Sequence, residues 1–238
     1  MSVDVLAIGA HPDDVELGVG GLIHKLTQSG RSVAILDLTR GELATRGSID
    51  ERRSEALAAA RILGALKREN AALPDGGITN TREQQLAVVR FIRSARPRII
   101  VAPMSDDRHP DHGAAHVLTR DANFFAGLRK IDTGHEPYRA PRMYFYRVHA
   151  ESSMPQLVVD ISAHFGAKLE AVRAYASQFH NPAYDGEQTF ISTPEFWESI
   201  RTKAAYWGAQ IGVSYGEALH ADSPVGIELL PGLEDTSL

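Results

Sequence analysis

The chain contains no cysteine, and this absence excludes several kinds of chemistry. There are no disulfides, no thiolate nucleophile and no cysteine-based zinc site, so nitrogen and oxygen atoms must hold any metal ion. The chain also has no excess of basic residues. Its formal net charge is −5, whereas a general nucleic-acid binder needs a basic face. Its apolar runs are far shorter than a membrane span. We therefore predict a protein that binds neither nucleic acid nor membranes.

The N-terminal residues show no basic region, no signal-type apolar segment and no small-residue cleavage site. This pattern predicts a cytoplasmic location. The 238 residues, of which 43% are hydrophobic and 23% charged, suffice for one large α/β domain with a substantial core.

Strand and helix patterns alternate along the first half of the chain. Short apolar runs predict strands at 3–10, 32–39 and 99–103, and apolar spacing predicts helices at 18–29, 83–95 and 113–128. A capping box at Ser48 predicts another helix that ends near Gly64. Beyond Pro141 we expect strands at 143–148 and 157–161 and helices at 163–179 and 194–211. The order predicts a Rossmann-like, mostly parallel sheet flanked by helices, with an elaborated C-terminal part.

A cluster of polar residues, His11, Asp13, Asp14 and Glu16, follows the first predicted strand. Open α/β sheets place their chemistry at such strand ends. His and Asp are good ligands for a divalent metal, and a second Asp beside a ligand is well placed to act as a base. In the alternative interpretation this is a polar turn in which Asp13 or Asp14 caps the next helix. Glu16 either orients His11 or lies exposed in the first helical turn.

A second polar cluster follows the strand predicted at 99–103, with the sequence Asp106-Asp107-Arg108-His109-Pro110-Asp111-His112. Because unpaired charges resist burial, so many at the edge of a sheet indicate a purpose. Parallel strands end at the same edge, so we expect the two clusters to converge. Arg108 either binds substrate carboxylates through its bidentate fork or pairs with Asp106 or Asp107.

Three glycines, Gly18, Gly20 and Gly21, lie near the first strand and invite a dinucleotide-binding interpretation. That fingerprint needs its glycines in the turn directly after the strand, where this chain has Asp13 and Asp14. The two carboxylates would repel a pyrophosphate. We expect the glycines instead to let the first helix pack closely on the sheet.

With both clusters in view, the chain resembles the LmbE/PIG-L family of metal-dependent N-acetylglucosaminyl deacetylases. The first family motif, A-H-P-D-D-x-E, matches residues 10–16, and the second, H-P-D-H, matches residues 109–112. Further stretches resemble the branch that deacetylates N-acetylglucosaminyl malate in bacillithiol biosynthesis; they lie at 37–42, 61–64, 73–77, 126–130, 175–179 and 212–217. The resemblance covers nearly the whole chain and implies a single domain over residues 1–238.

The resemblance also implies a role for individual residues. The implied metal ligands are His11, Asp14 and His112, with Zn²⁺ as the metal and Fe²⁺ as the alternative. Asp13 corresponds to the general base. His109 corresponds to the residue that stabilises the oxyanion, and Asp111 orients His109 or raises its pKa.

Substrate-binding residues are implied less sharply. Either Arg52 or Arg53 corresponds to a family position that approaches the substrate. Gln178 contacts the sugar or packs at a helix end. Some relatives place a tyrosine on a mobile C-terminal segment, whereas this chain has Phe196 near that position. Arg108 completes the substrate-binding set that we predict.

We therefore predict a zinc-dependent hydrolase that removes the acetyl group from an N-acetylglucosamine conjugate, with N-acetylglucosaminyl malate as the leading substrate. The alternatives are another N-acetylglucosaminide, a thiol S-conjugate, or a metal-binding protein without catalysis. The presence of Asp13 argues against the last, because storage of a metal needs no base. The resemblance further implies a homo-oligomer, namely a hexamer.

Overall fold

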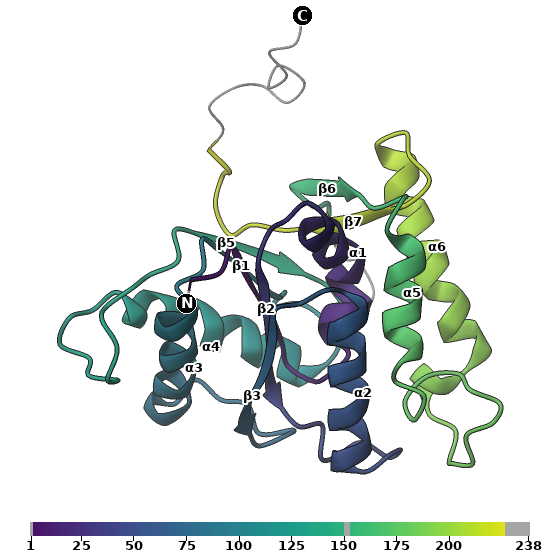
Figure 1. Ribbon diagram of the computed structural model, residues 1–238, viewed down its shortest axis with the longest axis horizontal. Helices are drawn as coiled ribbons and strands as arrows, with labels where there is room; N and C mark the ends of the chain where they lie inside the picture. Colours follow the sequence, from purple (N-terminus) through teal and green to yellow (C-terminus); the bar gives the residue numbers. More distant parts are fainter. Residues whose placement is uncertain (1, 150–152, 227–238) are drawn as a thin grey trace, which may run out of the picture.

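A five-stranded parallel sheet lies at the centre of the computed structural model, which describes residues 2–149 and 153–226 (Figure 1). Its strand order is β3-β2-β1-β4-β5. The strands are β1 (Val5–Gly9), β2 (Val33–Thr39), β3 (Lys67–Leu73), β4 (Ile99–Pro103) and β5 (Arg142–Tyr146). A separate antiparallel pair consists of β6 (Leu157–Asp160) and β7 (Gly216–Leu219). The predicted Rossmann-like sheet with an elaborated C-terminal part is confirmed.

Helices cover both faces of the sheet (Figure 1). One face carries α1 (Asp14–Gln28), α2 (Ile49–Ile62) and α5 (Phe165–Arg173), and the other carries α3 (Arg82–Ala95) and α4 (Pro110–Ala126). The last helix, α6 (Pro194–Gln210), packs against β7 and follows a short 3-10 turn, η1 (Phe190–Ser192). Among the described residues, no helix combines the length and apolar character needed to cross a membrane. The compartment stays a prediction.

The predicted helix start at Ser48 is confirmed. The Ser48 hydroxyl accepts a hydrogen bond from the Glu51 amide, and the Glu51 carboxylate accepts one from the Ser48 amide. This reciprocal pair satisfies two amides that the first turn of α2 leaves without intrahelical partners.

Two strands were missed by the sequence pattern. The residues of β3 are mostly polar, and the strand lies at the edge of the sheet, where only β2 pairs with it through the register Ala34↔Lys67. The four residues of β7 acquire strand geometry by pairing with β6, Leu157 opposite Leu219. Both assignments depend on partners distant in the sequence, and local periodicity cannot report them.

Two predicted helix boundaries were wrong. α1 begins at Asp14, four residues before the expected position, and bends where Val19 leaves helical geometry. α5 ends at Arg173 and does not continue to residue 179. Beyond it, the amide and hydroxyl of Ser177 donate hydrogen bonds to the Glu55 carboxylate of α2, at 2.7 and 2.8 Å. A tertiary contact therefore replaces the expected last turns of the helix.

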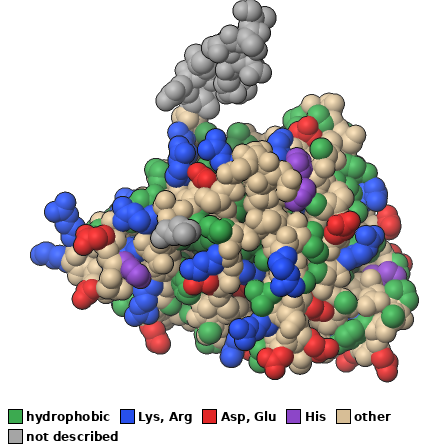
Figure 2. Space-filling model, viewed as in Figure 1, with side chains coloured by type: hydrophobic (Ala, Val, Ile, Leu, Met, Phe, Trp, Pro, Cys, Tyr) green, Lys and Arg blue, Asp and Glu red, His purple; other side chains and the backbone are tan. Residues whose placement is uncertain are grey.

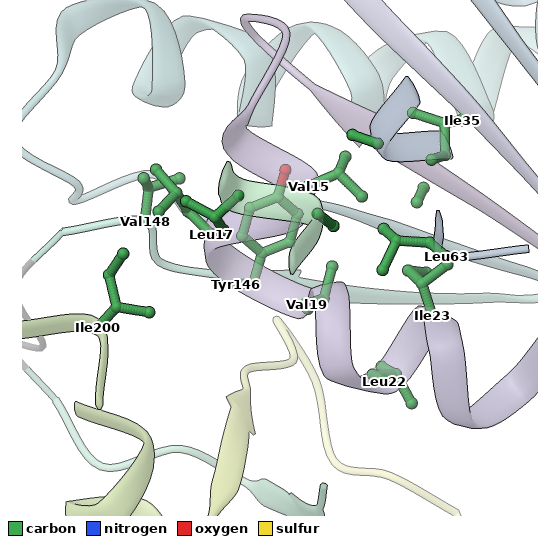
Figure 3. Close-up of a cluster of buried hydrophobic side chains, with 14 of the residues drawn as sticks. Val15, Leu17, Val19, Leu22, Ile23, Ile35, Leu63, Tyr146, Val148 and Ile200 are labelled. Carbon is green, nitrogen blue, oxygen red and sulfur yellow. The ribbon is translucent and has the colours of Figure 1, made fainter. Parts of the chain in front are cut away.

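The glycines of α1 have the packing role that the sequence predicted. A Cβ atom on Gly18 would overlap the ring of Tyr146, and one on Gly21 would lie 2.7 Å from the side chain of Ile161. The ring of Tyr146 lies in a buried cluster beside the labelled side chains of Val15, Leu17 and Val19 (Figure 3). Glycine at these positions lets α1 approach the sheet and β6 closely.

A buried ion-pair network supports the sheet behind the site. Arg68 of β3 donates to Glu16 of α1 at 2.5 Å and, through two nitrogens, to Asp37 of β2 at 2.7 and 2.8 Å. These side chains are at most 4% exposed. Both interpretations of Glu16 were therefore wrong, because its side chain is fully buried and its carboxylate is directed to Arg68 instead of His11. On the face shown in Figure 2, acidic and basic side chains are interspersed.

Candidate active site

The two polar clusters converge at the carboxyl ends of the parallel strands. Residues 11–14 follow β1, residues 106–112 follow β4, and further polar side chains come from the segments after β3 and β5. Because parallel strands end at one edge, loops that are up to about 140 residues apart meet there.

Asp14 lies between two imidazoles. Its Oδ1 is 3.1 Å from Nε2 of His112, and its Oδ2 is 3.5 Å from Nδ1 of His11. Its Oδ2 also accepts a hydrogen bond from the His11 amide at 2.9 Å. Asp14 is the first residue of α1, where the helix dipole favours a carboxylate. The expected ligand set is thus brought together at one point.

The arrangement fits a divalent cation. Ring nitrogens of His11, His109 and His112 lie within 4.8 Å of one another. Together with Asp14 they offer the nitrogen and oxygen donors that zinc accepts in catalytic sites. One carboxylate oxygen of Asp14 faces each of the rings of His11 and His112, so the geometry of these three residues fits the predicted ligand set. His109 lies beside this set.

His11 is held from its far side by two carboxylates. Its Nε2 lies 3.1 Å from Oδ1 of Asp75 and 3.2 Å from Oδ2 of Asp111. Asp111 also accepts from the Gly76 amide and Asp75 from the Leu43 amide, both at 2.8 Å. A proton shared at Nε2 leaves Nδ1 free to face Asp14. The carboxylate of Asp111 therefore contacts His11 and does not orient His109. The other predicted role holds in direction, because the charge of Asp111 raises the pKa of His109 against the larger, opposing effect of burial.

The general-base candidate, Asp13, is buried and held in an unusual backbone conformation. Its φ is +121°, a region in which a residue other than glycine costs about 1–3 kcal/mol. It occupies the N-cap position of α1 without making a capping hydrogen bond, so the capping interpretation is wrong for this side chain. Burial raises the pKa of Asp13 to about 7, and the nearby guanidinium of Arg52 opposes this effect.

Arg52 fixes Asp13 in place. One guanidinium nitrogen, Nη2, donates to Oδ2 of Asp13 at 2.7 Å and to the carbonyl of Pro12 at 2.7 Å. Nη1 donates to Oε1 of Gln178 at 2.7 Å. Arg53 instead is exposed and lines a separate cavity of about 540 Å³. Of the two arginines that the sequence left open, Arg52 therefore belongs to the site.

Electrostatics at the centre favour a cation. Burial alone would raise the pKa of Asp14, but the neighbouring imidazoles of His112 and His11 outweigh the effect of burial and hold this pKa well below its usual range. Burial alone would lower the pKa of His11, but the surrounding carboxylates outweigh the effect of burial and raise this pKa well above its usual value. The carboxylates thus stabilise positive charge at this point.

One ring nitrogen of His109 is engaged by the backbone. Its Nδ1 accepts a hydrogen bond from the backbone amide of Asp111 at 3.2 Å, which places the ring proton of the neutral form on Nε2. Burial and the nearby His11 and His112 lower the pKa of His109. A neutral His109 therefore retains a donor at Nε2.

Gln178 was predicted to contact the sugar or pack at a helix end, and Phe196 lies near the position where some relatives carry a tyrosine; the structure gives both residues protein partners. Gln178 is buried, and its amide donates to the carbonyl of Arg46 and the hydroxyl of Ser177 while its oxygen accepts from Arg52. It supports Arg52. Phe196 packs parallel to Phe179, with ring centroids 6.1 Å apart.

Arg108 is exposed, and its guanidinium lies 4.2 Å from the ring centroid of Phe190. The alternative pairing with Asp106 or Asp107 was wrong. Asp106 pairs with Arg147, and Asp107 accepts hydrogen bonds from His149.

Three residues of the site were missed by the sequence analysis: Asp75, Asp107 and His149. Asp75 follows β3, the strand that was not predicted, and that strand end was the missing signal. Asp107 lies within the second cluster but was given only a pairing role. His149 lies three residues after the end of β5, and no sequence motif marked it. Counting every His and Asp after a predicted strand would have included Asp107 and His149, whereas Asp75 required β3 to be predicted as well.

A cavity of about 920 Å³ adjoins the site. Arg108 and His149 line it on the side of the polar clusters, and much of the remaining wall comes from α6, including Phe196, Ile200 and Trp207. The His149 ring lies 5.6 Å from that of His112, so the cavity begins one ring away from the proposed metal ligands.

Comparison with known proteins identifies consistent relatives. The PIG-L family model, described as GlcNAc-PI de-N-acetylase, matches residues 6–123. The chain is 35% identical over 250 residues to diacetylchitobiose deacetylase of Thermococcus kodakarensis, covering 96% of this chain and 84% of that one. The crystal structure of the conserved protein TT1542 from Thermus thermophilus is 39% identical, with a TM-score of 0.86 and coverage of 97% and 98%. The N,N'-diacetylchitobiose deacetylase of Pyrococcus horikoshii is 29% identical, with a TM-score of 0.79 and coverage of 91% and 82%.

Proposed function

The chain belongs to the PIG-L family of deacetylases, and from that premise we propose that Asp13 and the residues around Asp14 remove the acetyl group from an N-acetylglucosamine conjugate. The observation that carries this proposal is the position of Asp14. One of its oxygens faces each of two imidazoles, and the adjacent Asp13 is held by Arg52. A ligand set with a separately held carboxylate beside it is the arrangement that hydrolysis of an amide needs.

The proposed ligands are His11, Asp14 and His112. When bound there, zinc supplies Lewis acidity that polarises the acetyl carbonyl and lowers the pKa of water. Asp13 takes the proton from the attacking water and later delivers it to the glucosamine nitrogen as the amide bond breaks, so that acetate and a free amine result. Arg52 keeps the Asp13 carboxylate at this position during both transfers.

His109 supplies a hydrogen bond to the oxyanion. Its Nε2 carries the proton while Nδ1 accepts from the Asp111 amide, so donation requires no change of tautomer. Loss of one oxyanion donor typically costs about 10²–10³ in kcat. This estimate is the effect expected for His109→Ala.

For the aglycone we propose malate, recognised by Arg108. Its side chain lines the large cavity and lies against the ring of Phe190, and it forms no hydrogen bond or ion pair among the described residues, so its donors are open to carboxylates. Similarity to diacetylchitobiose deacetylases supports a second sugar as the rival aglycone. A sugar carries no negative charge, so the two aglycones differ in their dependence on Arg108.

Acetate release tests the proposal. Metal-stripped protein is assayed without metal and with Zn²⁺ or Fe²⁺ restored, on N-acetylglucosaminyl malate, diacetylchitobiose and N-acetylglucosamine. Metal-dependent turnover of any of these supports the deacetylase assignment. Turnover of the malate conjugate that falls with Arg108→Met supports malate, whereas preference for diacetylchitobiose refutes it. No turnover of any substrate by zinc-loaded protein refutes the N-acetylglucosamine assignment.

The base assignment has its own test. Asp13→Asn should lower turnover by about 10²–10⁴-fold, the usual contribution of general acid–base catalysis, while bound zinc stays stoichiometric. Unchanged acetate release by folded, zinc-loaded Asp13→Asn would refute the assignment of Asp13 as the base. We also propose a homo-oligomer, hexameric by family resemblance, which light scattering of the purified protein tests.

A further inference from the structure

Asp107 is a buried carboxylate that joins two segments of the site. Its Oδ2 accepts hydrogen bonds from the amides of Val148 at 2.7 Å and His149 at 3.1 Å. Its Oδ1 lies 2.9 Å from Nδ1 of His149 and 3.3 Å from Nδ1 of His112. The side chain has no exposed area. One carboxylate thus contacts a proposed metal ligand and the segment that follows β5.

We propose that Asp107 is a positioning residue that fixes which nitrogen of His112 faces the metal. This inference rests on the proposed function, because it takes His112 as a ligand. A neutral imidazole carries one proton, and a carboxylate beside Nδ1 keeps that proton on Nδ1. The lone pair of Nε2 is then directed at Asp14, 3.1 Å away. The 3.3 Å separation falls outside hydrogen-bond geometry, and Nδ1 has no hydrogen-bond partner among the described residues, so the carboxylate acts on it as a nearby negative charge that favours the proton on Nδ1.

Contacts with Val148 and His149 fix the orientation of the Asp107 carboxylate. Its other contacts come from the segment after β5, so this segment sets the direction of the carboxylate. The ring of His149 stacks on that of His112, with centroids 5.6 Å apart and planes at 21°. Lys203 of α6 in turn donates to the carbonyls of Arg147 and His149, at 2.6 and 3.0 Å. The orientation of a ligand after β4 therefore depends on contacts from β5 and α6.

Asp107 and the carboxylates beside His11 have matching roles. Asp75 and Asp111 lie beside Nε2 of His11, and Asp107 lies beside Nδ1 of His112. Each histidine of the proposed set therefore has a carboxylate at the nitrogen that faces away from Asp14. Such outer partners typically raise metal affinity about 10- to 100-fold.

Zinc affinity of purified metal-free protein tests the proposal, measured by competition with a chromophoric chelator. Asp107→Asn should raise the zinc Kd about 10- to 100-fold. The matched control is Asp106→Asn, which makes the same change at the neighbouring residue, removes a partner of Arg147 and leaves His112 untouched. Its zinc Kd should stay within about threefold of wild type. Circular dichroism and urea unfolding of the metal-free proteins show whether each variant is folded.

His149→Phe provides a second variant, because it keeps a ring against His112 and removes only the Nδ1 contact to Asp107. It should raise the zinc Kd by less than Asp107→Asn does. A folded Asp107→Asn protein with wild-type zinc affinity overturns the inference, as does an equal loss of affinity in Asp106→Asn. If Asp107→Asn does not fold, wild-type affinity in folded His149→Phe overturns it. Wild-type protein that binds no zinc refutes the proposed function instead.

Discussion

Arg52 and Arg53 are adjacent arginines with different surroundings, and replacing each with methionine separates a role in catalysis from a general effect of charge. Arg52 is buried and donates to Asp13 at 2.7 Å, whereas Arg53 is exposed. Methionine keeps most of the side-chain volume and removes the donors. Arg52→Met should therefore disturb the proposed base, and Arg53→Met should leave turnover within about twofold of wild type.

The structure sets the size of the effect. The side chains of Arg52 and Asp13 are only 7% and 6% exposed, so water does not replace the lost contact. A hydrogen bond to a charged group contributes about 1.5–3 kcal/mol, and each 1.36 kcal/mol is tenfold in rate. If Arg52 holds Asp13 for proton transfer, kcat should fall about 10- to 150-fold with little change in KM.

Steady-state acetate release on the substrate that wild type turns over best is the assay, with zinc content and urea unfolding measured alongside. A rise in KM at unchanged kcat would mean that Arg52 binds the substrate, as the family resemblance implied, and not the base. A folded, zinc-loaded Arg52→Met protein whose kcat lies within about threefold of wild type would refute the reasoning.

Three further predictions concern stability, each measured by urea unfolding. Arg68→Met should lower the free energy of unfolding by about 3–5 kcal/mol, because it leaves two buried carboxylates without their partner. Lys67→Met breaks an exposed ion pair on the same strand and should lower it by less than about 1 kcal/mol. Equal losses in the two variants would contradict this. Gly18→Ala should lower the free energy of unfolding by about 1–3 kcal/mol, because its Cβ overlaps the ring of Tyr146. The Cβ of Gly166→Ala meets open space, so this variant should be neutral or stabilising. A neutral Gly18→Ala would contradict the close packing of α1 on Tyr146. Burial and a neighbouring imidazole lower the pKa of His24, so the unfolded chain binds this proton more tightly. The stability contributed by neutral His24 is present above about pH 6.5 and is lost as the pH falls below it. Wild type should therefore lose stability relative to His24→Gln between about pH 7.5 and about pH 5.5. A difference in unfolding free energy between the two proteins that does not change with pH would contradict the lowered pKa.

Local sequence patterns predicted much of the fold. The buried strands β1, β2 and β4 and the capped helix α2 were predicted because their signals lie within a few consecutive residues, as in the capping box at Ser48. The edge strand β3 escaped prediction because its polar sequence becomes a strand only by pairing with β2. Missing β3 also hid Asp75, since nothing marked that residue as lying at a strand end.

The sequence by itself determined the chemical types at the site: histidines and carboxylates after two strands, no thiols, and a second Asp beside the proposed ligands. Only the tertiary structure decided which groups meet. It selected Arg52 over Arg53, directed Asp111 to His11, and brought His149 to Asp107. The physical reason is that residue types and short-range spacing are local properties of the chain. Hydrogen-bond partners across an active site depend on sheet register and on loops that meet only after the strands have paired.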